Sequence, residues 1–275
     1  NPGPSQPPAQ LGQYFQDALE EDVTSMSHRA PRFSEYYRSV LTSFQQKLGL
    51  PTDYHLYFFN SATECWSVLA ESLVQQHSLH FFSGDFGKRW FDYTQALHPG
   101  AQGVQFHRET PFSEVLSEHE DSSTPELVAV THNETSNASQ VLPTYLPALR
   151  SRYPDPLLAV DATSSLAGLG LPLQDADIWF ASVQKAFGLP AGLSVMALSP
   201  RAVKRAQQIG FKGQYNALVR VEEKYEKLQT VCTPNMLGIY LMHRVLADFP
   251  AIAEVDVQVR ARAAEYYLQA QVESG

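Results

Sequence analysis

One stretch of the sequence decides the fold, Ala181-Ser182-Val183-Gln184-Lys185-Ala186-Phe187-Gly188-Leu189-Pro190-Ala191-Gly192. It places a single lysine after the apolar run 178–181 and before a turn rich in glycine and proline, which predicts a lysine just beyond the end of a buried strand. Removing an ammonium group from water is costly, so a lysine at the rim of a sheet needs a reason. Lys185 is either a structural residue at a strand end or an amine nucleophile that can form a Schiff base.

An aspartate upstream follows a second buried strand. The apolar run 157–160 leads into Asp161-Ala162-Thr163-Ser164-Ser165. By itself, Asp161 could be an ordinary turn or helix-cap residue. Beside a strand-end lysine it provides what a pyridoxal phosphate site needs, because that cofactor is held by a lysine and a carboxylate keeps its ring nitrogen protonated. Asp161 and Lys185 are therefore the candidate catalytic pair.

Strand-like and helix-like segments alternate along the chain, which indicates an α/β fold with a mostly parallel sheet covered by helices on both faces. Expected strands are 54–59, 79–82, 127–131, 157–160, 178–181 and 193–198, the last two as an antiparallel pair. Expected helices are 63–76, 87–97, one that starts at Ser199-Pro200, and 235–249. Ligands of such sheets bind at the carboxyl ends of the strands, where Ser61, Thr135, Asp161 and Lys185 are expected.

Short motifs follow one another in the order found in a known enzyme family. They are Pro2-Gly3-Pro4, Ser27-His28-Arg29, Ser61-Ala62-Thr63, Gly84-Asp85-Phe86-Gly87, Asn133-Glu134-Thr135, Asp161-Ala162-Thr163-Ser164-Ser165, Ser182-Val183-Gln184-Lys185 and Thr233-Pro234-Asn235. From residue 1 to about residue 246 the chain resembles the class V aminotransferases, which are fold-type-I pyridoxal phosphate enzymes, and among them it is most similar to phosphoserine aminotransferase. The resemblance implies transamination of an amino acid and a keto acid in serine biosynthesis.

The same resemblance implies roles around the cofactor. Ser61 and Glu64 fit a capping box at a helix start, where Ala62 and Thr63 would hold the cofactor phosphate. Phosphoserine aminotransferases usually carry Gly-Arg at the Ala62-Thr63 position, so this departure leaves the exact substrate open. Phe86 would stack on the pyridine ring, with a core phenylalanine as the alternative.

Further residues are assigned in the same way. Thr135 would bind the phenolic oxygen of the cofactor, and Gln184 would contact its phosphate. Thr233 would reach the phosphate of a neighbouring subunit, which implies a homodimer with shared active sites. His28 and Arg29 would bind the substrate phosphate, for which the planar fork of arginine is well suited.

The resemblance also divides the chain into two parts. Residues 1–248 are expected to form the large cofactor-binding domain, with a proline-rich extended segment at 2–8 and a polar loop at 118–125. Residues 249–275 are expected to begin a smaller C-terminal domain that is only partly present. Family members usually continue further, so we expect a truncated chain whose arginine for the substrate carboxylate lies beyond Gly275.

Composition narrows the class of partner. The formal net charge of −9 argues against nucleic acid or an anionic membrane as the main partner. The two cysteines, Cys65 and Cys232, form neither a disulfide framework nor a metal motif, so we expect no metal and a reducing, cytoplasmic location. No apolar run is long enough to span a bilayer, and no signal peptide is apparent.

Several alternatives stay in view. The Ser182-to-Lys185 motif also satisfies the S-x-x-K pattern of serine acyl-enzymes, but the accompanying Ser-Asp-Asn and Lys-Thr-Gly motifs are missing. Within the same fold, a serine– or alanine–glyoxylate aminotransferase or a cysteine desulfurase are the rival enzymes. A desulfurase would stack a histidine where this chain has Phe86, and it needs a catalytic cysteine in the C-terminal domain. A homologue that keeps the fold only for binding is disfavoured, because Asp161 and Lys185 are both present.

Overall fold

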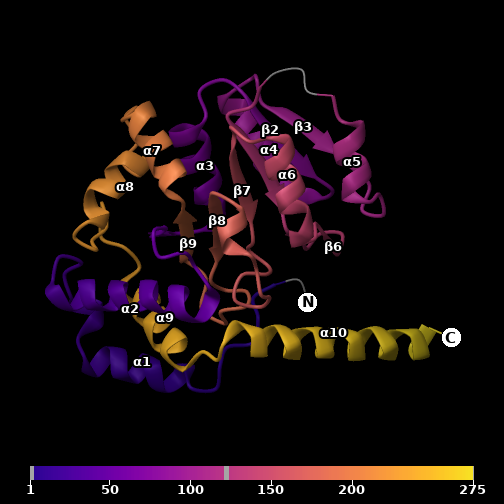
Figure 1. Cartoon of the computed structure of the whole chain (residues 1–275). Helices are drawn as coiled ribbons and strands as arrows, with labels where there is room; N and C mark the ends of the chain where they lie inside the picture. Colours follow the sequence, from indigo (N-terminus) through magenta and orange to yellow (C-terminus); the bar gives the residue numbers. More distant parts are fainter. Residues whose placement is uncertain (1–2, 121–123, 275) are drawn as a thin grey trace.

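A seven-stranded sheet forms the centre of the computed structural model, which describes residues 3–120 and 124–274 (Figure 1). The strand order is β1-β9-β8-β7-β4-β2-β3. The strands are β1 (His55–Phe59), β2 (Ser78–Phe82), β3 (Gln102–Gln105), β4 (Leu127–Thr131), β7 (Leu157–Asp161), β8 (Ile178–Ser182) and β9 (Ser194–Leu198). Strand β9 is antiparallel to β8 and β1, and the remaining neighbours are parallel. The predicted mostly parallel sheet and the predicted antiparallel pair are both confirmed.

Helices cover both faces of the sheet, because successive side chains of a strand point to opposite sides and both sets are apolar. In β1, Leu56 and Phe58 join one buried cluster, and Tyr57 and Phe59 join the other. The first cluster contains α1 (Leu11–Glu20), α2 (Pro31–Leu48), α5 (Phe112–Glu118), α6 (Leu146–Arg152) and α9 (Met236–Asp248). The second contains α3 (Ala62–Leu73), α4 (Asp85–Leu97), α7 (Pro200–Ile209) and α8 (Leu218–Tyr225).

Short elements connect these layers. A separate two-stranded ribbon, β5 (Asn133–Glu134) with β6 (Ser139–Gln140), follows directly after β4. The described residues also form 3₁₀ turns at η1 (Val23–Ser25), η2 (Pro143–Tyr145) and η3 (Leu173–Asp175). The ribbon continues from the carboxyl end of β4, so it lies at the edge of the sheet where ligands were expected.

Side-chain caps start three helices in the described part of the chain, and the sequence predicts two of them, at Ser61 and Ser199. The third is Asn235, whose Oδ1 accepts from Gly238 N at 2.8 Å and begins α9. Ser199 Oγ accepts a hydrogen bond from Ala202 N at 3.2 Å and begins α7. Ser61 Oγ accepts one from Glu64 N at 3.1 Å and begins α3. The second half of the predicted capping box differs, because the Glu64 carboxylate accepts from Asn60 N at 2.7 Å, one residue before the cap.

The C-terminal part of the chain is a single helix, α10 (Ile252–Ser274), which projects away from the body of the protein (Figure 1). No single helix among the described residues has the length and apolar composition to cross a membrane, and α9 with α10 pass that test only as a pair bent by 89°. The division at residue 249 remains a prediction. Of the proline-rich segment, Pro2 lies outside the described residues and Pro4–Pro8 has no regular structure, while the predicted loop at 118–125 lies partly outside them.

Neither cysteine is in a disulfide: Cys65 is buried and Cys232 is exposed. Within residues 3–120 and 124–274, no group of histidine, cysteine, aspartate and glutamate side chains is arranged to hold a metal ion.

Candidate active site

The carboxyl ends of three parallel strands meet at one cavity. Thr131 at the end of β4 pairs with Asp161 at the end of β7, and Asp161 pairs with Phe180 near the end of β8. The cavity has a volume of about 150 Å³, roughly ten times the space that one water molecule needs. The predicted site residues that line it are Ala62, Thr63, Phe86, Thr135, Asp161, Gln184 and Lys185. The topology therefore brings together most of the residues that the sequence singles out.

Asp161 is a buried carboxylate without a cation. Its side chain is 4 % exposed, and it forms no ion pair with any residue that the structure describes. Oδ1 accepts from Thr163 N at 2.9 Å and Oδ2 from Trp66 Nε1 at 3.3 Å. Burial raises the pKa of Asp161, a rise that the hydrogen bonds from Thr163 and Trp66 oppose. A cationic ligand in the cavity would complete this site.

Lys185 lies three residues beyond the end of β8 and is half-buried. Its Nζ donates to the carbonyl oxygen of Gly3 at 3.3 Å. The N-terminal segment runs along the lysine loop, since Ser5 N donates to Gln184 O at 2.9 Å and Ser5 Oγ donates to Lys185 O. The lysine amine therefore faces the cavity with one backbone partner and no carboxylate within ion-pair distance among the described residues.

The first turn of α3 forms another wall. The first N–H groups of a helix lack partners within the helix and carry its positive dipole end. Ala62 N donates to Ser182 Oγ at 2.9 Å, and Glu64 N is taken by Ser61. This leaves the Thr63 amide as the first-turn donor without an acceptor in the described part of the chain. A phosphate group would find that amide and the Thr63 hydroxyl together.

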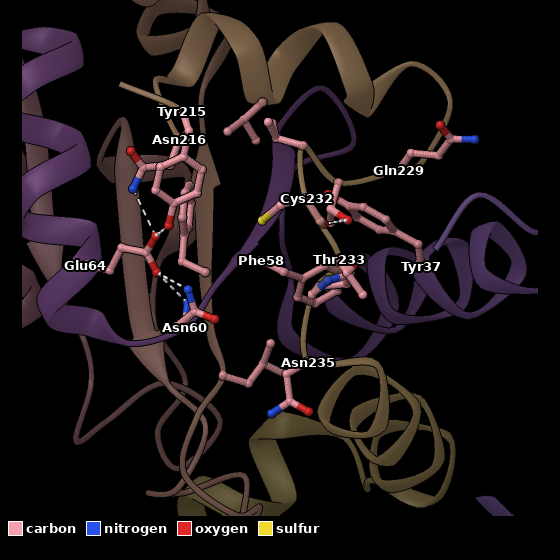
Figure 2. Close-up of a pocket in the computed structure, with 16 residues that line it drawn as sticks. Tyr37, Phe58, Asn60, Glu64, Tyr215, Asn216, Gln229, Cys232, Thr233 and Asn235 are labelled. Carbon is pink, nitrogen blue, oxygen red and sulfur yellow. Dashed lines mark hydrogen bonds between the residues drawn. The ribbon is translucent and has the colours of Figure 1, made fainter. Parts of the chain in front are cut away.

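The Glu64 carboxylate points away from the cavity, although its place in the sequence put a negative charge beside the proposed phosphate site. Oε1 accepts from Tyr215 OH at 3.1 Å and from Asn216 Nδ2 at 2.9 Å. Oε2 accepts from both nitrogens of Asn60. Figure 2 shows these bonds, which fix Glu64 in the wall of a different pocket.

Phe86 and Thr135 line the cavity from two different segments of the chain, the start of α4 and the residue after β5. Phe86 lies in the first turn of α4 and is 40 % exposed, which excludes the alternative of an ordinary core phenylalanine. Thr135 follows β5, and its Oγ1 is 2.6 Å from Ser164 Oγ. An exposed ring and a hydroxyl at the rim can both contact a flat, polar ligand.

Thr233, His28 and Arg29 lie outside the lysine cavity. Thr233 is exposed and lines the pocket of Figure 2, and its Oγ1 is 3.3 Å from His28 Nδ1. Arg29 Nη1 donates to Gln229 Oε1 at 3.1 Å, and Gln229 lines the same pocket. Burial, together with the charge of Arg29, lowers the pKa of His28. These residues form a second group, separate from Lys185.

Six further residues line the cavity to which sequence reasoning assigned no role: Trp66, Thr131, Asn133, Thr163, Ser164 and Ser182. Trp66, in the second turn of α3, donates to Asp161 across the helix–sheet interface, and nothing in its local sequence signals this. Thr131 Oγ1 and Thr163 Oγ1 are buried and have no hydrogen-bond partner among the described residues. Thr163 could have been found from the sequence, because it lies two residues after Asp161 in the same motif. Buried hydroxyls without partners are rare, so both threonines indicate a missing ligand.

A lysine and a cation-free buried aspartate on one cavity, at the carboxyl ends of a mostly parallel sheet, are features of fold-type-I pyridoxal phosphate enzymes. The sequence profile of the class-V aminotransferases matches residues 108–274. The chain belongs to this family, and the resemblance found from its motifs is confirmed.

Individual relatives agree with this assignment. The phosphoserine aminotransferase of Rhodococcus jostii is 27% identical over 235 residues, which are 80% of this chain and 58% of the relative, so the chain spans less than two thirds of that length. The crystal structure of a phosphoserine aminotransferase from Cytophaga hutchinsonii superposes with a TM-score of 0.84 at 31% identity, over 90% of this chain and 69% of that one. A phosphoserine aminotransferase from Trichomonas vaginalis with bound pyridoxal phosphate shares the fold, with a TM-score of 0.78 at 18% identity over 97% and 75% of the two chains.

Proposed function

We propose that the chain binds pyridoxal phosphate in the Lys185 cavity and catalyses transamination, with phosphoserine and 2-oxoglutarate as the substrate pair in one direction. The observation that carries the proposal is Asp161, a buried carboxylate that faces the same cavity as Lys185 and has no cation of its own. A buried charge without a partner is costly, so a site that keeps one is built for a cationic ligand.

The residues present fit this cofactor. A protonated pyridinium supplies the cation that Asp161 lacks. The amide and hydroxyl of Thr63 offer donors for a phosphate at the start of α3, with Gln184 beside them in the cavity wall. The hydroxyls of Thr131 and Thr163 are buried in the same wall without a partner, as expected where a polar ligand is bound.

Each residue has a chemical task in this proposal. When bound, pyridoxal phosphate provides an electron sink for negative charge at the substrate α carbon. Asp161 would hold the proton on the ring nitrogen, aided by the hydrogen bonds from Trp66 and Thr163 that favour its charged form. Lys185 would hold the cofactor and then, as a free amine, move the proton at the α carbon. Phe86 would cover the ring and exclude water.

The substrate proposal rests on the relatives and on the second group of residues. Phosphoserine carries a phosphate, and Arg29 offers a guanidinium with no carboxylate paired to it in the part of the chain that the structure describes. Thr233 and His28 accompany it outside the Lys185 cavity. We propose a homodimer in which this group completes the cavity of the neighbouring subunit.

The cofactor proposal is tested by the visible absorption spectrum of the purified protein with added pyridoxal phosphate. After unbound cofactor is removed, we expect a visible band that stays with the wild-type protein and is lost or altered in Lys185→Ala, because the covalent link to this amine both retains the cofactor and changes its absorption. Lys204→Ala is the matched control, since Lys204 is an exposed residue of α7 that lines a different pocket. A band that survives in Lys185→Ala and disappears in the control would reject the assignment.

The shared-site proposal is tested by mixing two inactive variants, Lys185→Ala and Arg29→Ala. In a mixed dimer, one cavity would combine the intact lysine of one subunit with the intact arginine of the other. Random mixing makes half of the dimers mixed with one working site each, so about a quarter of the wild-type activity should return. No recovery after subunit exchange, verified by mass spectrometry, would show that each subunit uses its own Arg29.

The substrate is tested by comparing phosphoserine, serine and alanine as amino donors at equal concentration. Phosphoserine should give the largest kcat/KM, and Arg29→Ala should reduce that value more for phosphoserine than for alanine, since only the former has a phosphate. A preference for alanine or serine that Arg29→Ala does not alter would favour a glyoxylate-type aminotransferase. Release of sulfide from cysteine would favour a desulfurase.

A further inference from the structure

The first turn of α4 is capped by residues from another segment of the chain. Gly84 occupies the cap position and has no side chain to accept a hydrogen bond. In its place, Gly87 N donates to Glu134 Oε2 at 3.0 Å, and Asp85 N donates to Ser136 Oγ at 2.9 Å. The bonds that a serine or aspartate cap would normally supply therefore come from the segment that follows β4.

Glycine at position 84 is required because the side chains of Glu134 and Ser136 pack closely against it, and not because of its backbone conformation. Its φ of −147° is accessible to any residue. A Cβ atom built on Gly84 would lie 2.5 Å from Glu134 Cγ and 2.5 Å from Ser136 Oγ, closer than real contacts allow. Gly84, the residue directly before α4, and the Glu134 side chain on β5 are thus complementary in shape.

Glu134 is a buried charge whose two oxygens are both occupied. The side chain is 2 % exposed, and Oε1 accepts from Ser136 N at 3.1 Å and from Ser136 Oγ at 2.6 Å. No ion pair to Glu134 is formed within residues 3–120 and 124–274. A carboxylate can accept on both sides at once, whereas an amide cannot, and the positive end of the α4 dipole favours its charge.

The four bonded positions enclose two residues of the cavity wall. Phe86 lies between Asp85 and Gly87, whose amides are both held. Thr135 lies between Glu134 and Ser136, whose side chains accept the hydrogen bonds from those two amides. We call these four hydrogen-bonded residues, Asp85, Gly87, Glu134 and Ser136, the clamp. The clamp fixes the backbone on both sides of each residue that would contact the ring of the cofactor.

We propose that Glu134 is a positioning residue that caps α4 from outside and sets Phe86 and Thr135 at the spacing the cofactor ring requires. The inference rests on the proposed function, since it concerns the same cavity. Glu134 itself does not line that cavity, so it would position Phe86 and Thr135 from behind the wall. Its charge also contributes to the raised pKa of Asp161. A loss of the clamp should loosen the cofactor while Lys185 and the hydrogen bonds from Trp66 and Thr163 to Asp161 stay in place.

The test uses Glu134→Gln, which keeps the shape but turns an NH₂ group toward one of the donors. Amide hydrogen exchange is measured first, on the full chain without added cofactor. Exchange of the Asp85–Gly87 amides should accelerate by about 10-fold or more, the size expected for one lost bond to a charged acceptor. The dissociation constant for pyridoxal phosphate should then rise by about 10- to 100-fold.

Glu126→Gln provides a matched control. Glu126 also accepts from backbone amides, those of Gln75 and Gln76, but it directly precedes β4 and so lies at the amino end of that strand, opposite to the cavity. This variant should lose stability without any change in cofactor affinity. Gly84→Ala is a second clamp variant, because its Cβ would displace the Glu134 side chain. It should accelerate exchange and weaken cofactor binding in the same way, and it tests the proposal if Glu134→Gln fails to fold.

The outcomes separate this inference from the proposed function. Unchanged amide exchange at residues 85–87 in both Glu134→Gln and Gly84→Ala would show that Glu134 does not cap α4. Faster exchange with unchanged cofactor affinity would overturn the positioning role while leaving the cap. If the wild type binds no pyridoxal phosphate at all, the proposed function fails, and the exchange result still decides whether the cap exists.

Discussion

Two buried histidines should make the protein strongly sensitive to mild acid. His80 is 1 % exposed and His132 is 3 % exposed. Burial lowers the pKa of His80 to about 3. Burial, with a smaller contribution from the charge of Arg260, lowers the pKa of His132 to about 4. Both rings are neutral in the folded state, whereas in the unfolded chain they take up protons near pH 6.5.

The sign of the effect follows from proton binding. Below pH 6.5 the unfolded state binds more protons than the folded state, so the free energy of unfolding falls as the pH falls. The stabilisation from the two neutral histidines is fully present above pH 6.5. It is lost as the pH falls toward their folded-state pKa values of about 4 and about 3. At pH 5, linkage gives a loss of about 2 kcal/mol per histidine, or about 4 kcal/mol together.

This loss is a large part of the total stability of a typical domain, which is about 5–15 kcal/mol. Because pH 5 lies above both folded-state pKa values, the size is set almost entirely by the unfolded value. The lowered pKa values of His28 and His243 act in the same direction. Carboxylates with a lowered pKa, such as Glu126, release their stabilisation only at more acidic pH.

Urea unfolding of the protein without added cofactor, at pH values from 7.5 to 5, measures this loss. His80→Asn and His132→Asn should each reduce the difference between the two ends of the range by about 2 kcal/mol. His107→Asn is the control, since that ring is in contact with solvent. If both buried-site variants keep the full pH dependence of the wild type, the reasoning from burial is wrong.

Three further outcomes are expected. Trp66→Phe removes the indole donor to Asp161, so the pKa of Asp161 should rise further, and pyridoxal phosphate affinity, measured by absorbance titration, should fall by about 10-fold. Ser199→Ala removes the cap of α7 and a bond to Asp177, and urea unfolding should show a loss of about 1–2 kcal/mol with unchanged activity. Thr233→Ala should weaken cofactor binding only under conditions where the protein is a dimer, and equal weakening at concentrations that give monomer would contradict the shared site.

The sequence alone determined the main features of the fold and half of the site. Apolar runs bounded by glycine, proline and polar residues marked the strands, and strand alternation with helices implied a mostly parallel sheet. The position of Asp161 and Lys185 at strand ends followed from the same local pattern, because the carboxyl ends of parallel strands share one edge. Local caps at Ser61 and Ser199 were predictable for the same reason, since their bonds join residues three apart.

Only the tertiary structure decided which side chains from distant segments face each other. Trp66 reaches Asp161 over a separation of 95 residues, and Glu134 reaches Gly87 over 47. The placement of Thr233 and His28 apart from Lys185 also depends on how α9 and the segment before α2 pack. Local patterns record the period of burial along the chain, but these contacts depend on the order in which the strands assemble and on the shape of facing side chains.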